Sequence, residues 1–232
     1  MSGRKLSIII PVFDEAAGIE AALTTLSQYR GRGIEVIVVD GGSRDGTPAL
    51  ARPLADRVLI APRGRAAQMN SGSAVARSDV LLFLHADTQL PDNADLLIEH
   101  CLARSGHVWG RFDVQFDRGG LLTVIAFMMN LRSRLTGIAT GDQALFVTRA
   151  TFDAVGGFPE IPLMEDVALS THLKRISRPL CLRARVTTSA RRWRKHGALR
   201  TMFLMWRLRL AYFLGADPAQ LARHYGYAPA EQ

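Results

Sequence analysis

The stretch that most constrains how this chain folds is Val80–Thr88, where five apolar residues, Val80 to Leu84, run directly into His85, Ala86 and Asp87. An apolar run too short for a buried helix and bounded by polar residues is typical of a strand buried on both faces of a sheet. Ligands of open α/β sheets bind at the carboxyl ends of the strands. We therefore expect Asp87 to face a ligand, for example a divalent cation that holds phosphate. The alternative is that Asp87 caps the following helix.

Apolar runs that alternate with helical patterns precede this stretch. The pattern predicts strands over residues 6–12, 35–40 and 57–60, and helices over 16–29, from Thr47 and from Arg65, with a further helix over 91–102. Strand, helix and strand in close succession form a βαβ unit, which implies a parallel sheet with right-handed crossovers. The sequence thus predicts an α/β fold whose first half is a regular parallel sheet.

The turn after the second strand is rich in glycine. Asp40 ends that strand and is followed by Gly41-Gly42-Ser43-Arg44-Asp45-Gly46-Thr47. The spacing fits neither the dinucleotide fingerprint nor the phosphate-binding loop of NTPases. An isolated glycine-rich segment is most simply a turn, but this one follows an aspartate at a strand end, which favours close approach to a ligand.

Arg65 is predicted in the first turn of its helix, where a positive charge is unfavourable by about 0.3–1 kcal/mol. This local conflict predicts an anionic partner for Arg65, either a ligand phosphate or a carboxylate.

The pattern changes after residue 107. Val108–Phe116 alternates, as an antiparallel or edge strand does, and residues 121–135 form a long apolar helix. Asp142–Val147 leads into another strand, a helix begins around Glu165, and Cys181–Val186 alternates with its arginines on one face.

The composition narrows the partners and the compartment. Of 232 residues, 48% are hydrophobic and 22% charged, as in an ordinary folded protein, and the net charge is +8. Basic residues concentrate between Lys174 and Arg209, and no acidic residue lies between Asp166 and Asp217. Anionic lipid or a phosphorylated small molecule fits this charge, whereas no nucleic-acid-binding motif accompanies it. The two cysteines, Cys101 and Cys181, are expected to be buried thiols.

Targeting signals are not evident in the sequence. The chain enters its first predicted strand almost at Met1, and no run of eighteen uncharged apolar residues exists. We expect a cytoplasmic protein without a signal peptide, either free or peripheral at the inner face of the cytoplasmic membrane.

Residues 198–214 have the pattern of a basic amphipathic helix. Apolar residues recur at steps of three and four, and Arg200, Arg207 and Arg209 fall between them. Such a helix either packs on the protein's own core or docks on an anionic membrane, and the pattern leaves both open.

Taken together, the motifs resemble the family 2 inverting glycosyltransferases, whose architecture is called GT-A. The motifs are Pro11-Val12-Phe13-Asp14-Glu15, Val39 to Thr47, His85-Ala86-Asp87 and Glu165-Asp166, in the family's order. The resemblance covers residues 6 to about 190 and implies a mixed, mainly parallel sheet flanked by helices. The short length, Gly64-Arg65-Ala66 and Gly215-Ala216-Asp217-Pro218 more narrowly resemble a small bacterial subgroup associated with arsenosugar and radical-SAM gene neighbourhoods.

The resemblance implies a division of labour along the chain. Residues 1–190 would be the glycosyltransferase domain, with the nucleotide sugar bound by residues 1–104 and the acceptor by 105–190, and residues 191–232 would form a C-terminal basic helical segment. The implied nucleotide-sugar-binding residues are Pro11, Val12, Glu15, Asp40, Gly42, Arg65, His85, Ala86 and Asp87. Those implied at the acceptor or the diphosphate are Gly141, Asp142, Glu165, Arg191, Arg192 and Trp193.

The resemblance also implies a chemistry. Asp166 would deprotonate the acceptor hydroxyl, and Asp87 would bind Mg²⁺ or Mn²⁺, which prefer carboxylate and phosphate oxygens. The sequence departs from the family's D-x-D pattern by having His85 at the first position, where it either contacts the ligand or hydrogen-bonds in the core. His196 is a further candidate metal ligand. Alternatively, Glu165 and Asp166 only favour a helix N-terminus.

Two other functions are compatible with such a fold. A nucleotidyltransferase also uses a βαβ sheet and Mg²⁺, but it needs a lysine-containing glycine-rich loop after the first strand, which Pro11–Glu15 is not. A catalytically silent protein that binds a nucleotide sugar is the second alternative.

Overall fold

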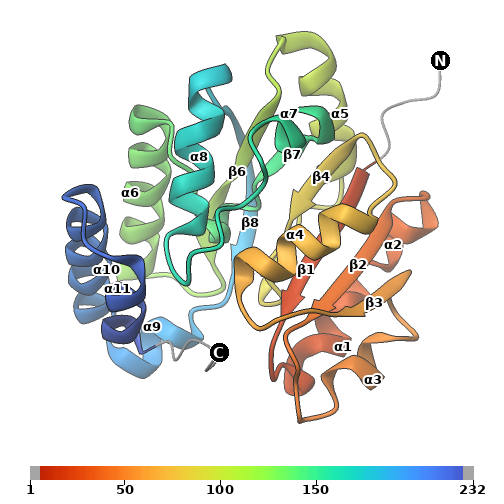
Figure 1. Cartoon of the computed structure of the whole chain (residues 1–232), viewed down its shortest axis with the longest axis horizontal. Coiled ribbons are helices and arrows are strands. Elements are labelled where there is room, and N and C mark those ends of the chain that lie inside the picture. Colours follow the sequence, from red (N-terminus) through yellow and green to blue (C-terminus); the bar gives the residue numbers. More distant parts are fainter. Residues whose placement is uncertain (1–5, 227–232) are drawn as a thin grey trace.

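A mixed sheet forms the centre of the molecule. The computed structural model describes residues 6–226, apart from the side chains of Arg192 and His196. Within them, eight strands lie in the order β3-β2-β1-β4-β7-β6-β8-β5 (Figure 1). The strands are β1 Leu6–Val12, β2 Glu35–Asp40, β3 Arg57–Ile60, β4 Val80–Phe83, β5 Thr88–Gln89, β6 Trp109–Phe116, β7 Phe146–Thr148 and β8 Leu180–Thr188.

The first half of the sheet is parallel, as the sequence predicts. β1 pairs in parallel with β2 and with β4, and β2 pairs in parallel with β3. The connecting helices are α1 Ala16–Thr25, α2 Ser27–Gly31, α3 Thr47–Ala51 and α4 Arg65–Val75. The single helix predicted over 16–29 is broken at Leu26, whose backbone N–H bonds to the carbonyl of Leu23 and so tightens the last turn of α1.

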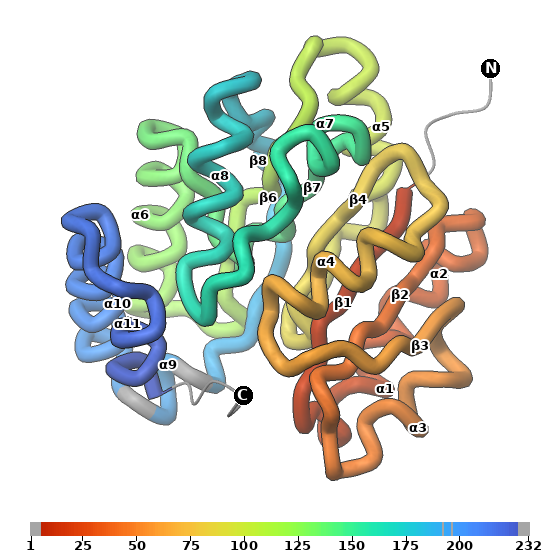
Figure 2. Tube along the Cα trace, viewed as in Figure 1, coloured from red at the N-terminus to blue at the C-terminus, as the bar shows by residue number. Residues whose placement is uncertain are grey.

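The second half of the sheet mixes directions. β7 runs antiparallel to β4, β6 antiparallel to β7, and β8 parallel to β6. The strand β6, expected to be antiparallel or at an edge, is therefore antiparallel to one neighbour only and lies inside the sheet. Figure 2 shows β7 returning beside β4 although the two are far apart in sequence. The remaining helices are α5 Ala94–Ser105, α6 Leu121–Thr136, the short 3₁₀ helix η1 Gly141–Gln143, α7 Arg149–Ala154, α8 Glu165–Ile176, α9 Arg191–His196, α10 Ala198–Phe213 and α11 Pro218–Tyr225.

Helices cover both faces of the sheet, so both faces of β1 are buried, and both carry apolar residues. Ile8 and Ile10 pack with residues of α1 and α5 on one face, while Ile9 packs with residues of α4, α7 and α8 on the other. Cys101 and Cys181 are free but only half-buried, so the expectation of buried thiols is wrong.

The C-terminal helices complete the molecule beside α6 and α8. Leu208 of α10 and Leu221 of α11 pack with Met164 and Val167, and Met202 packs against the buried face of α6. Across residues 6–226, no helix has both the length and the apolar character needed to cross a bilayer. The architecture is the predicted α/β one, a mainly parallel sheet between helices.

Candidate active site

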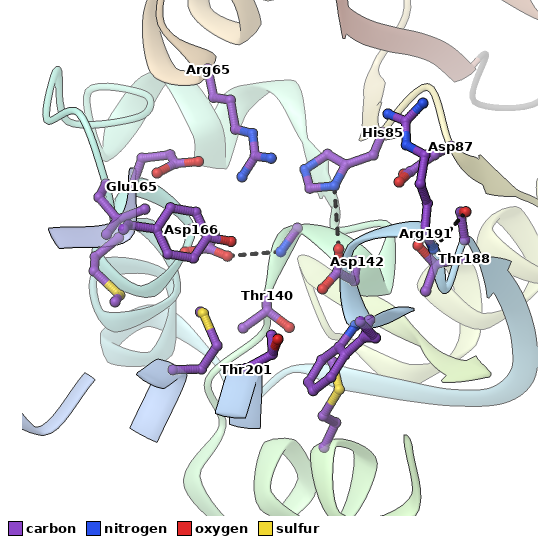
Figure 3. A pocket seen from close by; sticks show the side chains of 18 of the residues that line it. Arg65, His85, Asp87, Thr140, Asp142, Glu165, Asp166, Thr188, Arg191 and Thr201 are labelled. Carbon is purple, nitrogen blue, oxygen red and sulfur yellow. Dashed lines mark hydrogen bonds and ion pairs between the residues drawn. The ribbon is translucent and has the colours of Figure 1, made fainter. Parts of the chain in front are cut away.

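A pocket of about 990 Å³ opens at the carboxyl ends of β1 and β4. Pro11, Val12 and Glu15 after β1 and His85, Ala86 and Asp87 after β4 line one side of it. The other walls come from α4, η1 and the elements α6, α8 and α10 (Figure 3). The sheet-edge ligand site predicted from Val80–Thr88 is therefore a real cavity.

Asp87 faces this pocket with an exposed side chain. Its backbone carbonyl accepts a hydrogen bond from Ser189 N–H at 3.1 Å, which ties the loop after β4 to the end of β8. The next helix, α5, begins at Ala94 and has Asn93 at its N-cap. Asp87 therefore does not cap that helix, and the capping alternative is wrong.

His85 is held between β4 and η1. Its Nδ1 lies 3.4 Å from Asp142 Oδ1, and its side chain is only 14% exposed. A Cβ at Gly141 would lie 2.4 Å from two atoms of the His85 ring, so only glycine leaves room for the imidazole there. Burial acts to raise the pKa of Asp142, but the hydrogen bond and charge of His85, with Arg65, hold it below its ordinary value.

Asp166 lies in the first turn of α8, and two backbone donors fix its carboxylate. Gly141 N–H donates to Oδ2 at 2.8 Å and Val167 N–H to Oδ1 at 2.7 Å. Met164, just before the helix, is buried and has a left-handed backbone with φ of 71°. A left-handed residue other than glycine costs about 1–3 kcal/mol, and such strain clusters at functional sites.

Glu165 and Arg65 face each other across the pocket (Figure 3). Burial, and then the charge of Asp166, raise the pKa of Glu165 to about 7. Arg65 is the first residue of α4; burial acts to lower its pKa, but the charges of Glu165 first, and then of Tyr225, Asp142 and Asp166, raise it. The anionic partner predicted for Arg65 therefore includes protein carboxylates.

Asp40 and Gly42 do not line the pocket, contrary to the contact expected of them. Asp40 is fully buried, and its Oδ2 accepts the N–H groups of Gly42 and Ser43 at 2.8 Å each. Its Oδ1 accepts the Ser43 hydroxyl. Both carboxylate oxygens thus bind the glycine-rich turn, and the buried carboxylate has no exposed oxygen to accept a hydrogen bond from the base of a nucleotide.

Gln68 is a residue that the sequence reasoning missed. Its buried amide donates to the carbonyls of Val12 at 2.8 Å and Val39 at 2.7 Å, and its oxygen accepts Gly64 N–H at 3.3 Å. It thereby joins the ends of β1 and β2 to the start of α4. A single glutamine among small helical residues gives no sequence signal for this role.

The C-terminal segment reaches the pocket through α9 and α10. Arg191 forms an ion pair with Glu15 at 3.3 Å, and Trp193 packs edge-on against Phe116 with ring centroids 5.4 Å apart. The predicted side chains of Arg192 and His196 lie outside the described residues. Arg132 and Arg209, which the sequence reasoning did not select, also line this side.

Comparison with known proteins identifies the family. The family model described as Glycosyl transferase family 2 matches residues 7–151, more than half of the chain. The chain belongs to this family. The match spans β1 to β7 and so includes His85, Ala86 and Asp87, whereas the acid pair of α8 lies beyond it.

Relatives within the family share part of the sequence. The chain is 35% identical over 91 residues to glycosyltransferase AglE of Haloferax volcanii, a match of 35% of this chain and 30% of that one. It is 33% identical over 101 residues to undecaprenyl-phosphate 4-deoxy-4-formamido-L-arabinose transferase of Pseudomonas paraeruginosa, covering 37% and 29% of the two chains. The matches thus span about a third of the length of these relatives.

A solved structure supports the fold over nearly the whole chain. The mannosyltransferase PcManGT from Pyrobaculum calidifontis, in complex with GDP-Man and Mn²⁺, superposes with a TM-score of 0.64 at 21% identity. The match covers 99% of this chain and 67% of that one. The fold expected from the resemblance, a mixed and mainly parallel sheet flanked by helices, is confirmed.

Proposed function

We propose that this protein transfers a sugar from a nucleotide-diphosphate sugar to an acceptor hydroxyl, with inversion at the anomeric carbon. The observation that carries the proposal is that Asp87, in the loop after β4, and Asp166, in α8, line one pocket in a chain of glycosyl transferase family 2. One carboxylate is then available for the diphosphate end of the donor and another for the acceptor. Pro11, Val12 and Glu15, on the same wall as Asp87, would contact the nucleotide.

Asp166 is the proposed general base. Its carboxylate takes the proton of the acceptor hydroxyl as the acceptor oxygen bonds to the anomeric carbon, and the bond from that carbon to the diphosphate oxygen breaks. A base must be held in a defined direction to act. The two N–H groups that bind Asp166 supply that direction.

A divalent metal at Asp87 is the proposed cofactor, and the residues present fit a metal that the substrate also binds. Among residues 6–226, no three His, Cys, Asp or Glu side chains gather closely enough to hold a metal ion. Mg²⁺ commonly binds through one or two carboxylates together with substrate phosphates. When bound, Mg²⁺ or Mn²⁺ would offset negative charge on the departing diphosphate. Mn²⁺ accompanies the nucleotide sugar in the PcManGT complex.

Two measurements test this function. Nucleotide sugars are screened for thermal stabilisation with and without Mn²⁺, since a ligand of the folded state raises its stability. We expect one donor to stabilise the protein only with the metal, and Asp87→Ala to remove that effect. Asp166→Asn should keep donor binding and lose sugar transfer, while Asp153→Asn, an exposed aspartate outside the pocket, should keep both. Undiminished transfer by Asp166→Asn would refute the base.

We also propose that the protein works at an anionic membrane surface on the cytoplasmic side. The large exposed apolar side chains of α10 and the residue after it are Leu199, Phe203, Trp206, Leu210, Phe213 and Leu214, and α6 adds Val124, Phe127 and Leu135. Arg200 and Arg207 of α10 are exposed as well. This combination suits anionic headgroups. The related P. paraeruginosa enzyme is named for an undecaprenyl-phosphate substrate, which makes a lipid-linked acceptor a candidate beside a small molecule.

The division of the chain belongs to the same proposal. Residues 1–104 would bind the donor and 105–190 the acceptor, with the segment from 191 closing the acceptor side. The narrower membership in the subgroup associated with arsenosugar and radical-SAM gene neighbourhoods also stays a proposal.

A further inference from the structure

Two arginines in the pocket wall have guanidinium nitrogens that are buried without a hydrogen-bond partner among residues 6–226. Arg132 of α6 and Arg209 of α10 both line the pocket. Within the described part of the chain, Nε and Nη2 of Arg132 and Nε of Arg209 are buried without a hydrogen-bond partner. Because buried polar groups are normally paired, guanidinium groups left in this state need a ligand.

A hydroxyl in the same wall is also unsatisfied. Thr201, on the pocket-facing side of α10, is only 4% exposed, and its Oγ1 has no partner in the described residues. Figure 3 shows Thr201 and Thr140 on the side of the pocket away from Arg65. Three side chains from α6 and α10 that line one cavity thus carry buried donors without a partner in the described part of the chain.

The charges at this place are unbalanced. Burial lowers the pKa of Arg132 to about 10, and the positive charge of Arg209 adds to the effect. Asp166 and Asp142 act in the opposite direction, but the ion pairs found within residues 6–226 include none from either aspartate to these arginines. Two like charges in one partly buried wall favour the binding of an anion beside them.

The surroundings of the pair are apolar and adaptable. Met128 and Met129 of α6 and Met202, Met205 and Trp206 of α10 line the adjoining part of the pocket. Methionine side chains fit apolar bodies of irregular shape. A ligand held here would carry its anionic group at the arginines and an apolar portion along these side chains.

We propose that Arg132, Arg209 and Thr201 form a subsite for a phosphate group on the acceptor. The guanidinium fork matches phosphate geometry with two parallel hydrogen bonds, which favours phosphate as the anion. The subsite assigns the acceptor a chemical class, an alcohol that also carries a phosphate. The assignment to the acceptor rests on the proposed glycosyltransferase function, because the pair lines the same pocket as the proposed base Asp166.

Phosphate binding by purified variants tests the subsite. Inorganic phosphate is titrated at constant ionic strength and the melting temperature is followed. We expect phosphate to raise the melting temperature of the wild type until the site is saturated. Arg132→Gln and Arg209→Gln should each need at least about tenfold more phosphate for the same rise, since each loses a charged hydrogen bond. The control is Arg207→Gln, an exposed arginine of the same helix, which should behave as wild type. Equal responses of all four proteins would overturn the subsite.

Further measurements distinguish a lipid-type acceptor from a water-soluble one, and a failure of the subsite from a failure of the proposed function. Octyl phosphate that binds more tightly than inorganic phosphate would indicate a lipid-type acceptor, and equal affinities would indicate a water-soluble phosphomonoester. Both results support the subsite.

The controls separate a failure of the subsite from a failure of the proposed function. Without ligand, Arg132→Gln should melt no lower than wild type, because it removes an uncompensated charge. If Arg132→Gln abolishes stabilisation by GDP or UDP with Mn²⁺, the arginines serve the donor and the assignment to the acceptor is overturned. If phosphate binds through the pair but no donor supports transfer, the proposed function fails and the anion site stands.

Discussion

At the residue scale, the site depends on backbone atoms as much as on side chains. Gly141 has two duties: its N–H binds Asp166, and its missing Cβ makes room for His85. This accounts for the departure of His85 from the family's aspartate pattern, because the ring fills the space above η1 and pairs with Asp142. The contact could not be read from the sequence, since Gly141 and His85 lie far apart along the chain.

We expect Gly141→Ala to impair sugar transfer far more than it impairs folding. The added Cβ would meet His85 at 2.4 Å, so either the ring or η1, with its hydrogen bond to Asp166, must move. A displacement of about 1 Å at a catalytic group can reduce the rate by about tenfold to a hundredfold. Steady-state kinetics and thermal melts measure the two effects. Gly18→Ala is the control, because nothing lies within 4 Å of its Cβ. Equal activity of both variants would show that His85 and Asp166 need not be held in place.

Glu165 gives the protein a predictable dependence on pH. Its pKa rises from 4.5 to about 7 in the folded state, so the folded protein holds more protons than the unfolded chain between these values. Stability therefore falls as pH rises through this window. Glu165→Gln removes this contribution.

The measurement is a pair of melting curves for wild type and Glu165→Gln at about pH 5 and about pH 8. The melting temperature of the variant, relative to that of the wild type, should be higher at about pH 8 than at about pH 5. The expected rise is about 2–4 °C for each kcal/mol of unfolding free energy that the wild type loses between the two pH values. A difference between the two proteins that does not change with pH would contradict the raised pKa.

At the scale of elements, α10 supports the start of α8. Leu208 is 2% exposed and packs with Met164 and Val167, the residues that flank Glu165 and Asp166. The sequence predicted α10 as amphipathic but left open what its apolar face covers. Leu208 packs inward, whereas Leu210, Phe203 and Phe213 face outward. The helix therefore packs on the protein's own core through Leu208, and docking on a membrane through its exposed residues stays a proposal.

Leu208→Ala should destabilise the protein by about 2–5 kcal/mol, the usual cost of emptying a buried leucine site. We also expect weaker sugar transfer well below the melting temperature, because Met164 loses the side chain that packs beside the acid pair. Chemical denaturation and kinetics provide the data. Leu210→Ala, on the same helix and 61% exposed, should change stability by no more than about 0.5 kcal/mol. A similar loss in both variants would contradict the packing argument.

At the scale of the whole molecule, α6 and α10 lie next to each other, and both carry exposed apolar residues. We predict that it floats with vesicles containing anionic lipid, more strongly at low salt, because both apolar contact and charge contribute. Phe203→Ser combined with Phe213→Ser should abolish flotation. Ile176→Ser, which removes an exposed apolar residue of α8, should not. Protein that stays in solution with anionic vesicles would contradict the membrane proposal.

The parallel half of the fold could be predicted from sequence, and the rest only in part. Short apolar runs such as Val80–Phe83 identify their strands without knowledge of their neighbours. The position of β6 between β7 and β8 depends instead on Gly110, which lets Leu180 approach where a Cβ would lie 2.3 Å from its carbonyl oxygen. The position of Asp87 and Asp166 in the pocket could be predicted, because Asp87 follows a recognisable strand and Asp166 lies at the start of a recognisable helix. Arg132 and Arg209 were not, because inward-facing arginines look like any polar residue of an amphipathic helix.

The two walls of the pocket come from opposite ends of the chain. Residues up to Asp87 form the wall at β1 and β4, and residues from Phe116 onward form the wall of α6, α8 and α10. The walls touch at a few contacts, such as His85 with Asp142 and Glu15 with Arg191. Under the proposed function, substitutions on the inner faces of α6 and α10, away from these contacts, would alter what receives the sugar without altering what supplies it. Close relatives that diverge in substrate should therefore differ first along the inner faces of α6 and α10.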